Sequence, residues 1–176
     1  MGESHAAGWP SDGPTAAQLK EFFAQIEQRR ITKDIMQDII LGNYTVGNTA
    51  FRFDKREDGW ELAEDQEIVV PASLLEATTF LRRGESSISG EEMRRRSVEL
   101  GANLGQRQAE YLLDHQEEIP KEWRAFYLVF PGTFWRDRDG DLEVPCLRCY
   151  GGRWNLHFFW LGGDWGSSAR LVRARK

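Results

Sequence analysis

Apolar residues recur at helical spacing in the first quarter of the chain. Those from Leu19 to Ile26 fall at i, i+3, i+4 and i+7, after a Ser/Thr-x-x-Glu/Gln capping box that begins at Thr15, and a second apolar stripe runs from Ile35 to Ile40. Residues at this spacing lie on one face of a helix, and the capping box is typical of a helix start. The pattern therefore predicts two helices that form an αα-hairpin over residues 15–42.

The middle of the chain has a mixed pattern. Short alternating runs at 50–53 and 60–62 flank Asp58-Gly59 and predict a small β-hairpin. A capping box that begins at Ser73 predicts a helix that ends near Gly84. Between Glu57 and Glu67 there are six acidic residues and no basic one, so we expect this stretch to face solvent.

After residue 85 the pattern stays helical at first, and beyond Trp123 it changes to a period of two. Capping boxes that begin at Ser89 and Asn103 predict two helices, the first ending at Gly101 and the second before Pro120. Alternation then predicts four strands, with hairpin turns at Asp139-Gly140 and Gly151-Gly152, over residues 125–135, 142–150, 154–161 and 169–174.

These elements predict an α+β fold. It consists of an N-terminal helical hairpin and short strands, followed by two helices packed on a four-stranded antiparallel β-meander. A leader rich in Gly, Ser and Pro over residues 1–14 is expected to be flexible. We place a helical, acidic region with the small hairpin at 15–84 and a Trp-rich sheet domain at 85–176.

Composition narrows the class of protein. With 176 residues, 40% of them hydrophobic, and only two cysteines, the chain is neither a disordered polymer nor a disulfide-stapled miniprotein. The net charge is −5, and it is divided between −6 for residues 1–90 and +1 for residues 91–176. Neither a signal-peptide pattern nor a membrane-spanning apolar run occurs, which predicts a soluble cytoplasmic protein that does not engage a membrane.

A set of short motifs is distributed through the second half of the chain. They lie at 89–93, 99–105, 109–116, 127–133 and 152–154, and in Trp160-Leu161, Trp165 and 170–173. These motifs resemble those of a family of small uncharacterised bacterial proteins, and the resemblance covers about 90 C-terminal residues well and the first helices loosely. No activity is assigned to that family, so the resemblance supports a structural unit and implies no function.

Catalytic signatures do not stand out, and no cofactor-binding motif is present, so we expect neither catalysis nor a cofactor. Cys146 and Cys149 have zinc-knuckle spacing, but the second ligand pair is missing and ordinary core thiols are the favoured interpretation. A metal-dependent or hydrolytic enzyme that uses His115, His157 and this cysteine pair stays an alternative.

The C-terminal aromatic residues are the best indication of function. Five of the seven tryptophans fall between Trp123 and Trp165. They form either a Trp-rich core under the helices or part of a ligand-binding sheet face, because aromatic rings beside arginines suit both packing and stacking on a partner. For a binding face the candidate residues are Trp165, Arg153, His157, Phe159, Arg148, Arg170 and Arg173.

The leading functional hypothesis is a non-enzymatic binding or adaptor protein that contacts another protein through this sheet and the 162–168 loop. The alternative is a nucleic-acid-binding protein that uses the basic C-terminal residues Arg170, Arg173, Arg175 and Lys176.

Overall fold

The computed structural model describes residues 45–46 and 50–175, which all belong to one compact unit, Asp38–Lys176. The predicted leader and the predicted αα-hairpin lie outside the described residues. The helices are α3 (Gly90–Glu99) and α4 (Gln106–Asp114), with 3-10 turns η1 (Lys55–Asp58), η2 (Ala72–Leu74), η3 (Gln116–Glu118) and η4 (Lys121–Ala125). The strands are β1 (Thr45–Val46), β2 (Glu61–Glu64), β3 (Ile68–Val69), β4 (Leu75–Thr78), β5 (Ser87–Ser89), β6 (Tyr127–Val129), β7 (Phe134–Arg136), β8 (Leu142–Tyr150), β9 (Arg153–Trp160), β10 (Asp164–Gly166) and β11 (Ala169–Ala174).

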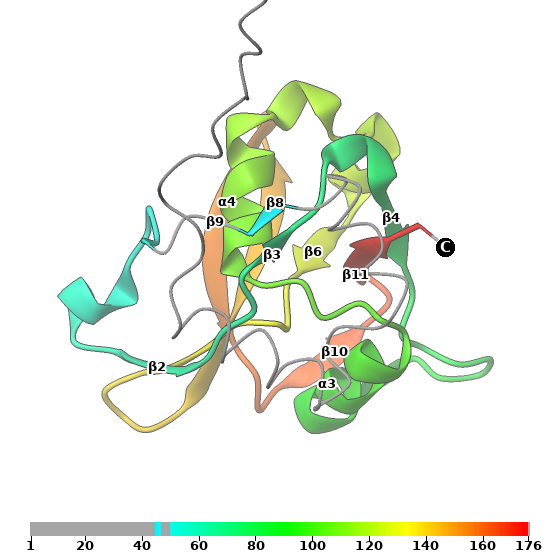
Figure 1. Ribbon diagram of the computed structural model, residues 1–176. Helices are drawn as coiled ribbons and strands as arrows, with labels where there is room; N and C mark the ends of the chain where they lie inside the picture. The colour runs from blue at the N-terminus through cyan, green and yellow to red at the C-terminus, as the bar shows by residue number, and fades with distance from the viewer. Residues whose placement is uncertain (1–44, 47–49, 176) are drawn as a thin grey trace, which may run out of the picture. The chain divides into compact units, whose positions relative to one another are not determined.

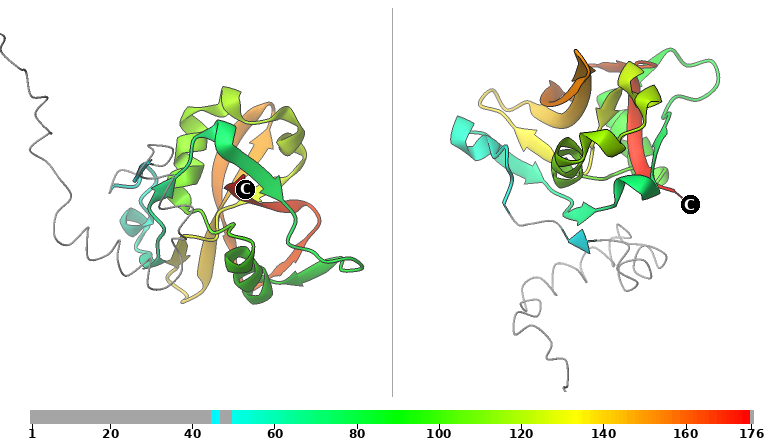
Figure 2. Two further views of the ribbon diagram at one scale, coloured as in Figure 1. Left: turned by 45° about the vertical axis from the view of Figure 1, so that its right-hand side comes forward. Right: turned by 90° about the horizontal axis from the view of Figure 1, so that it is seen from above.

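A curled, mixed sheet of seven strands organises the described residues (Figures 1 and 2). Its order is β2-β7-β8-β6-β11-β4, and β9 pairs with β8. Both β6 and β7 pair antiparallel with β8, each with a different part of that long strand. The pair of β11 with β6 is parallel, whereas β11 and β4 are antiparallel. Two small sheets, β1-β3 and β5-β10, complete the pairing.

The predicted four-stranded antiparallel meander is wrong. Strands β8, β9 and β11 occupy the predicted segments, but the first predicted strand is divided into β6 and β7 by a turn at Pro131-Gly132. The segment after β9 does not form the next antiparallel strand beside β9, because it contains β10, which pairs with β5 in a separate small sheet. Strand β11 therefore joins the sheet beside β6, far from β9, and in parallel.

Strands from the first half of the chain enter the same sheet. Ser73 lies inside the 3-10 turn η2 and caps no helix, and the predicted helix over 73–84 is replaced by β4, whose Leu75 is fully buried beside β11. The predicted small hairpin does not form, because β2 pairs with β7 and not with 50–53. A single sheet thus crosses the boundary that the sequence analysis placed between residues 84 and 85.

The two described helices cover opposite faces of the sheet. Helix α3 begins as predicted, since the Ser89 hydroxyl accepts a hydrogen bond from the Glu92 N–H, and Gly101 follows it with a φ of +64°. Helix α4 lies across β8 and β9, in front of them in Figure 1. Its first residue is Gln106, so Gly105 is the N-cap and not the predicted Asn103.

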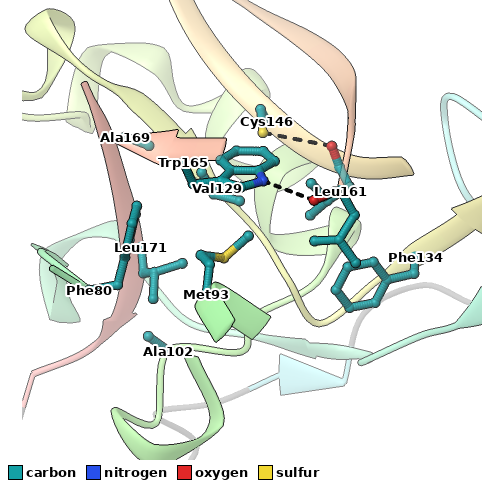
Figure 3. Close-up of a cluster of buried hydrophobic side chains, with 11 residues drawn as sticks. Phe80, Met93, Ala102, Val129, Phe134, Cys146, Leu161, Trp165, Ala169 and Leu171 are labelled. Atoms are coloured by element: carbon teal, nitrogen blue, oxygen red, sulfur yellow. Dashed lines mark hydrogen bonds between the residues drawn. The ribbon is translucent and has the colours of Figure 1, made fainter. Parts of the chain in front are cut away.

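The core on the α3 face consists of side chains that are far apart in the sequence, from Phe80 to Leu171. Figure 3 shows Met93 of α3 in one cluster with Cys146 of β8, Leu171 of β11 and Trp165 of β10. The Trp165 ring nitrogen donates to the Leu161 carbonyl at 3.2 Å, which ties the loop after β9 to this core.

Candidate functional site

The β8-β9 hairpin presents a polar, cationic row of side chains. Gly151 and Gly152 form its two-residue turn with φ values of +58° and +83°, and positive φ at both positions gives the twist that suits a hairpin. The register pairs Tyr150 with Arg153, Arg148 with Asn155 and Cys146 with His157. Because paired residues share a face, one set of outward side chains stands together. We name Arg148, Tyr150, Arg153, Asn155 and His157 the hairpin surface.

The hairpin surface is open and contains no carboxylate. All five residues are exposed, and the Tyr150 side chain is 79% exposed. The Arg148 guanidinium lies over the Tyr127 ring at 4.8 Å from the ring centre. Neither Arg148 nor Arg153 forms an ion pair with any described residue.

The arginines of α3 are in the opposite situation. Arg96 is buried and forms a fork to Glu85, and its hydrogen bond lowers the pKa of that carboxyl to about 2. Hydrogen bonds from Arg95 and Arg96 lower the pKa of Glu92 to about 2 as well. The cluster fixes the loop before β5 onto the helix, so these arginines serve the fold, whereas no described carboxylate pairs with the arginines of the hairpin surface.

A pocket continues the hairpin surface toward the end of β9. It has a volume of about 190 Å³ and lies between β9, β10 and the first residues of β6 and β11. The rings of Tyr127 and Phe159 meet edge to face at 5.4 Å, and His157 lies 6.0 Å from Phe159, so the row of side chains runs directly to the pocket wall. The lining residues include Tyr127, Phe159, Trp160, Asp164, Trp165 and Ala169.

The predicted aromatic residues divide between core and surface. Four of the five C-terminal tryptophans are buried, namely Trp123, Trp135, Trp154 and Trp165, which fits the Trp-rich core. Trp165 was a candidate binding residue, and the structure places it at 8% exposure, where it lines the pocket from the core side. Trp160 is 53% exposed at the pocket edge, where its ring covers Gly162.

The two C-terminal candidate arginines lie apart from the hairpin surface. Arg170 donates to the carbonyl groups of Ser167 and Ala169, each at 2.7 Å. Arg173 pairs with Glu76 at 2.6 Å and also donates to the Leu100 carbonyl. Arg173 therefore ties β11 to β4 and to the end of α3, whereas Arg170 bonds to its own strand and to the turn before it. Of the seven predicted site residues, Arg148, Arg153, His157 and Phe159 are brought together, with Trp165 behind the pocket.

The two cysteines, His115 and His157 do not form one site, although Cys146 lies across from His157 in the hairpin register. Three positions apart on a strand, Cys146 and Cys149 point to opposite faces of β8. Burial raises the pKa of the Cys146 thiol well above its usual value, and the thiol donates to the Val144 carbonyl. His115 stacks on Tyr111 and bonds to its carbonyl at 2.8 Å. Within the described ranges, no three His, Cys, Asp or Glu side chains are placed to hold a metal ion.

A buried polar cluster under α4 escaped the sequence analysis. The Thr133 hydroxyl accepts from the Gln106 N–H at 2.8 Å and donates to Asp65, which is ion-paired with the buried Arg107. The Thr133 hydroxyl thus caps the start of α4, because the N-cap residue Gly105 has no side chain that could do so. The stretch from Glu57 to Glu67 was expected to face solvent. This expectation is wrong for Asp65, whose side chain is largely buried in the cluster. No local spacing signals the cluster, because its members are 27 to 68 residues apart.

The same helix secures the strand before β4. The amide of Gln108 accepts from the Val70 N–H at 2.6 Å and donates to the Val70 carbonyl at 3.0 Å. The amide of Gln106 accepts from the Trp135 ring nitrogen at 2.6 Å and donates to Glu110. These bonds pair the buried amides of Gln106 and Gln108 within the protein, so the cluster positions α4 behind the hairpin.

Acidic residues gather at the far end of β8. Asp137 accepts the backbone N–H groups of Asp139 and Asp141 in the hairpin turn between β7 and β8. Partial burial, with the charges of Asp137 and Asp141, raises the pKa of Glu143 to about 7. The hairpin therefore has an anionic end and a cationic end, separated along β8.

No family model, curated protein or solved structure matches this chain. Among the described residues, no helix is both long enough and apolar enough to cross a membrane.

Proposed function

We propose that this chain is a binding or adaptor protein that holds another protein through the hairpin surface and the adjoining pocket. The observation that carries the proposal is the pair Arg148 and Arg153, exposed on a rigid hairpin without a carboxylate from the described residues. Arginine and tyrosine are enriched at protein interfaces, because each offers a large contact area together with directional polar groups.

The charge of the surface favours a protein over a nucleic acid as partner. Nucleic-acid binding draws its affinity from many phosphate contacts, and the hairpin surface offers two arginines on a chain with a net charge of −5. Of the four basic residues that the nucleic-acid hypothesis used, Arg170, Arg173 and Arg175 bond within the fold, and Lys176 lies outside the described residues. An interface of Tyr127, Tyr150 and two arginines suits an acidic protein surface.

The test uses two variants of the full chain that lose exposed arginines at different places on the surface. R148A/R153A removes both surface cations, and R83A removes an exposed arginine that lies in the loop between β4 and β5 and also has no ion-pair partner among the described residues. We expect wild type and R83A to capture the same protein from the source cells at about equal yield, and R148A/R153A to lose at least about 90% of it. Equal melting temperatures of the three proteins establish that the fold is kept.

Capture of the same proteins by R148A/R153A would refute the proposal. Salt-dependent binding of a single-stranded oligonucleotide that disappears in R148A/R153A would also refute it, and would assign the surface to nucleic acid instead.

A further inference from the structure

Strand β9 has an open edge. It pairs with β8 on one side, and no described strand pairs with its other side. The Leu161 N–H bonds to the Leu142 carbonyl, so the odd-numbered residues direct their backbone groups toward β8. The N–H and C=O of Leu156 and Phe158 therefore point away from the sheet.

Within the described part of the chain, one end of this edge has its backbone groups bonded by a side chain, and near the other end Trp60 and Lys55 contact only the ring of Phe158. The side-chain amide of Gln116 accepts from the Trp154 N–H at 2.9 Å and contacts its carbonyl at 3.4 Å, as a partner strand would. No described group bonds to the outward backbone groups of Leu156 and Phe158. A main chain bound at Leu156 and Phe158 displaces no described bond, whereas one that continues past Trp154 replaces the bonds of Gln116.

This edge also lacks the features that normally prevent strand addition. Edge strands are commonly protected by charged residues, proline or a bulge. Strand β2, at another edge, has a register shift between Leu62 and Glu64 and two glutamates. In contrast, residues 156–160 contain neither a carboxylate, a lysine nor a proline, and their register with β8 is unbroken.

We propose that β9 accepts an extended acidic segment of the partner protein as an additional strand; this inference rests on the proposed function and specifies its partner. An added strand lies about 4.8 Å from β9, with alternate side chains beside those of β9 on the same face. Its side chains on the hairpin face would stand next to Arg153, Asn155, His157 and Phe159 in turn.

The surface beside the edge defines the chemistry of that segment. Acidic side chains two residues apart fit next to Arg153 and Asn155, with Arg148 directly across from Asn155. An apolar side chain fits next to Phe159, at the mouth of the 190 Å³ pocket. Arg153 and Phe159 are six residues apart, about 20 Å along a strand. The segment should therefore place an acidic and an apolar residue six positions apart.

Charge disfavours a second copy of this chain as the occupant. Pairing β9 with β9 of another copy would place one carboxylate-free row of cationic and aromatic side chains beside an identical row. Such a pair gains backbone bonds but no complementary charges, whereas an acidic segment gains both.

The first experiment selects ligands without assuming their sequence. A displayed library of random nonapeptides is selected on the full chain and counter-selected on R148A/R153A. We expect enriched peptides with Asp or Glu at alternate positions and an apolar residue six positions from one acid. Enrichment of peptides without acidic residues, failure to enrich any peptide, or a concentration-dependent dimer formed through β9 would overturn the inference.

The second experiment tests the main-chain bonds. Amide hydrogen exchange of Leu156 and Phe158 should slow at least about tenfold when an enriched peptide is bound. Two forms of that peptide, N-methylated at one or the other alternating set of amides, serve as matched probes. One form should bind at least about tenfold more weakly and the other should keep its affinity, because alternate amides face β9 and solvent. Equal affinity of both forms, or unchanged exchange, would overturn strand addition.

The two proposals fail in different ways. If R148A/R153A loses the cellular partner while exchange at Leu156 and Phe158 is unchanged by that partner, the proposed function holds and strand addition is wrong. If R148A/R153A keeps the partner, the proposed function itself is wrong.

Discussion

Replacement of Thr133 by valine tests how α4 is held against the sheet. Thr133 is fully buried, and its hydroxyl serves both Gln106 and Asp65. Valine has nearly the same shape but neither accepts nor donates a hydrogen bond. The T133V protein would therefore keep its packing and lose only the two bonds.

The magnitude follows from the groups left unpaired. A buried Gln106 N–H without an acceptor costs about 1–3 kcal/mol, and a lost bond to a charged carboxylate such as Asp65 costs about 1.5–3 kcal/mol. Burial of the valine methyl group that replaces the hydroxyl offsets less than about 1 kcal/mol of this loss of stability. We expect T133V to lower the free energy of unfolding by about 2–4 kcal/mol.

Urea unfolding at neutral pH, followed by tryptophan fluorescence, measures this loss. T133S is the control, because it keeps the hydroxyl and removes one methyl group, at a cost of about 1 kcal/mol. If T133V and T133S unfold within about 0.5 kcal/mol of each other with equal slopes, the cap across the sheet contributes little and the reasoning fails.

Three further changes test other parts of the fold. The pKa of Glu143 is raised from 4.5 to about 7 in the folded protein, so its protonation adds stability that is present below pH 4.5 and is lost as the pH rises through 7. The E143Q variant should show a smaller decrease in the free energy of unfolding over this pH range, measured by denaturation curves. G90A should lower the free energy of unfolding by about 1–3 kcal/mol, although alanine favours helices, because its methyl group would lie 1.7 Å from the Leu161 carbonyl oxygen; a stabilised G90A would contradict the tight contact. A thiol reagent should label Cys149 in the native protein and Cys146 only after denaturation, and rapid native labelling of both would show that the core around Cys146 opens.

Local signals were reliable where the partners are close in sequence. The Ser89 capping box, the glycine after α3 and the Gly151-Gly152 turn all form as predicted, because each depends on bonds or dihedral angles within a few residues. The same kind of signal failed at Ser73. There the edge of β11 needs a partner, and β4 provides it with Leu75 buried, which outweighs a capping box whose contribution is about 1 kcal/mol.

Long-range pairing could not be derived from the pattern. Alternation located β8, β9 and β11 but contains no information about which strands become neighbours, so β6 was not expected between β8 and β11. For the same reason, the sequence predicted only part of the candidate site. His157 and Phe159 alternate on one strand, whereas the proximity of Arg148 to them depends on the hairpin register.

Tyr150 and Asn155 belong to the hairpin surface and were not among the predicted site residues. Their exposure depends on where α3 and the β5-β10 pair stop covering the sheet, and a single sequence does not indicate that limit. The open edge of β9 is likewise a property of strand order and has no counterpart in the amino-acid sequence of β9 itself.

The strand order of this sheet also determines how the chain can reach it. The β8-β9 hairpin closes through a two-residue turn, but Arg173 of β11 meets Glu76 of β4 across 97 residues. Closing so long a loop costs chain entropy before any contact repays it, and folds dominated by such pairings form in milliseconds to seconds. The hairpin can therefore form early, and during that interval the edge of β8 that later pairs with β6 and β7 is exposed as well as the edge of β9.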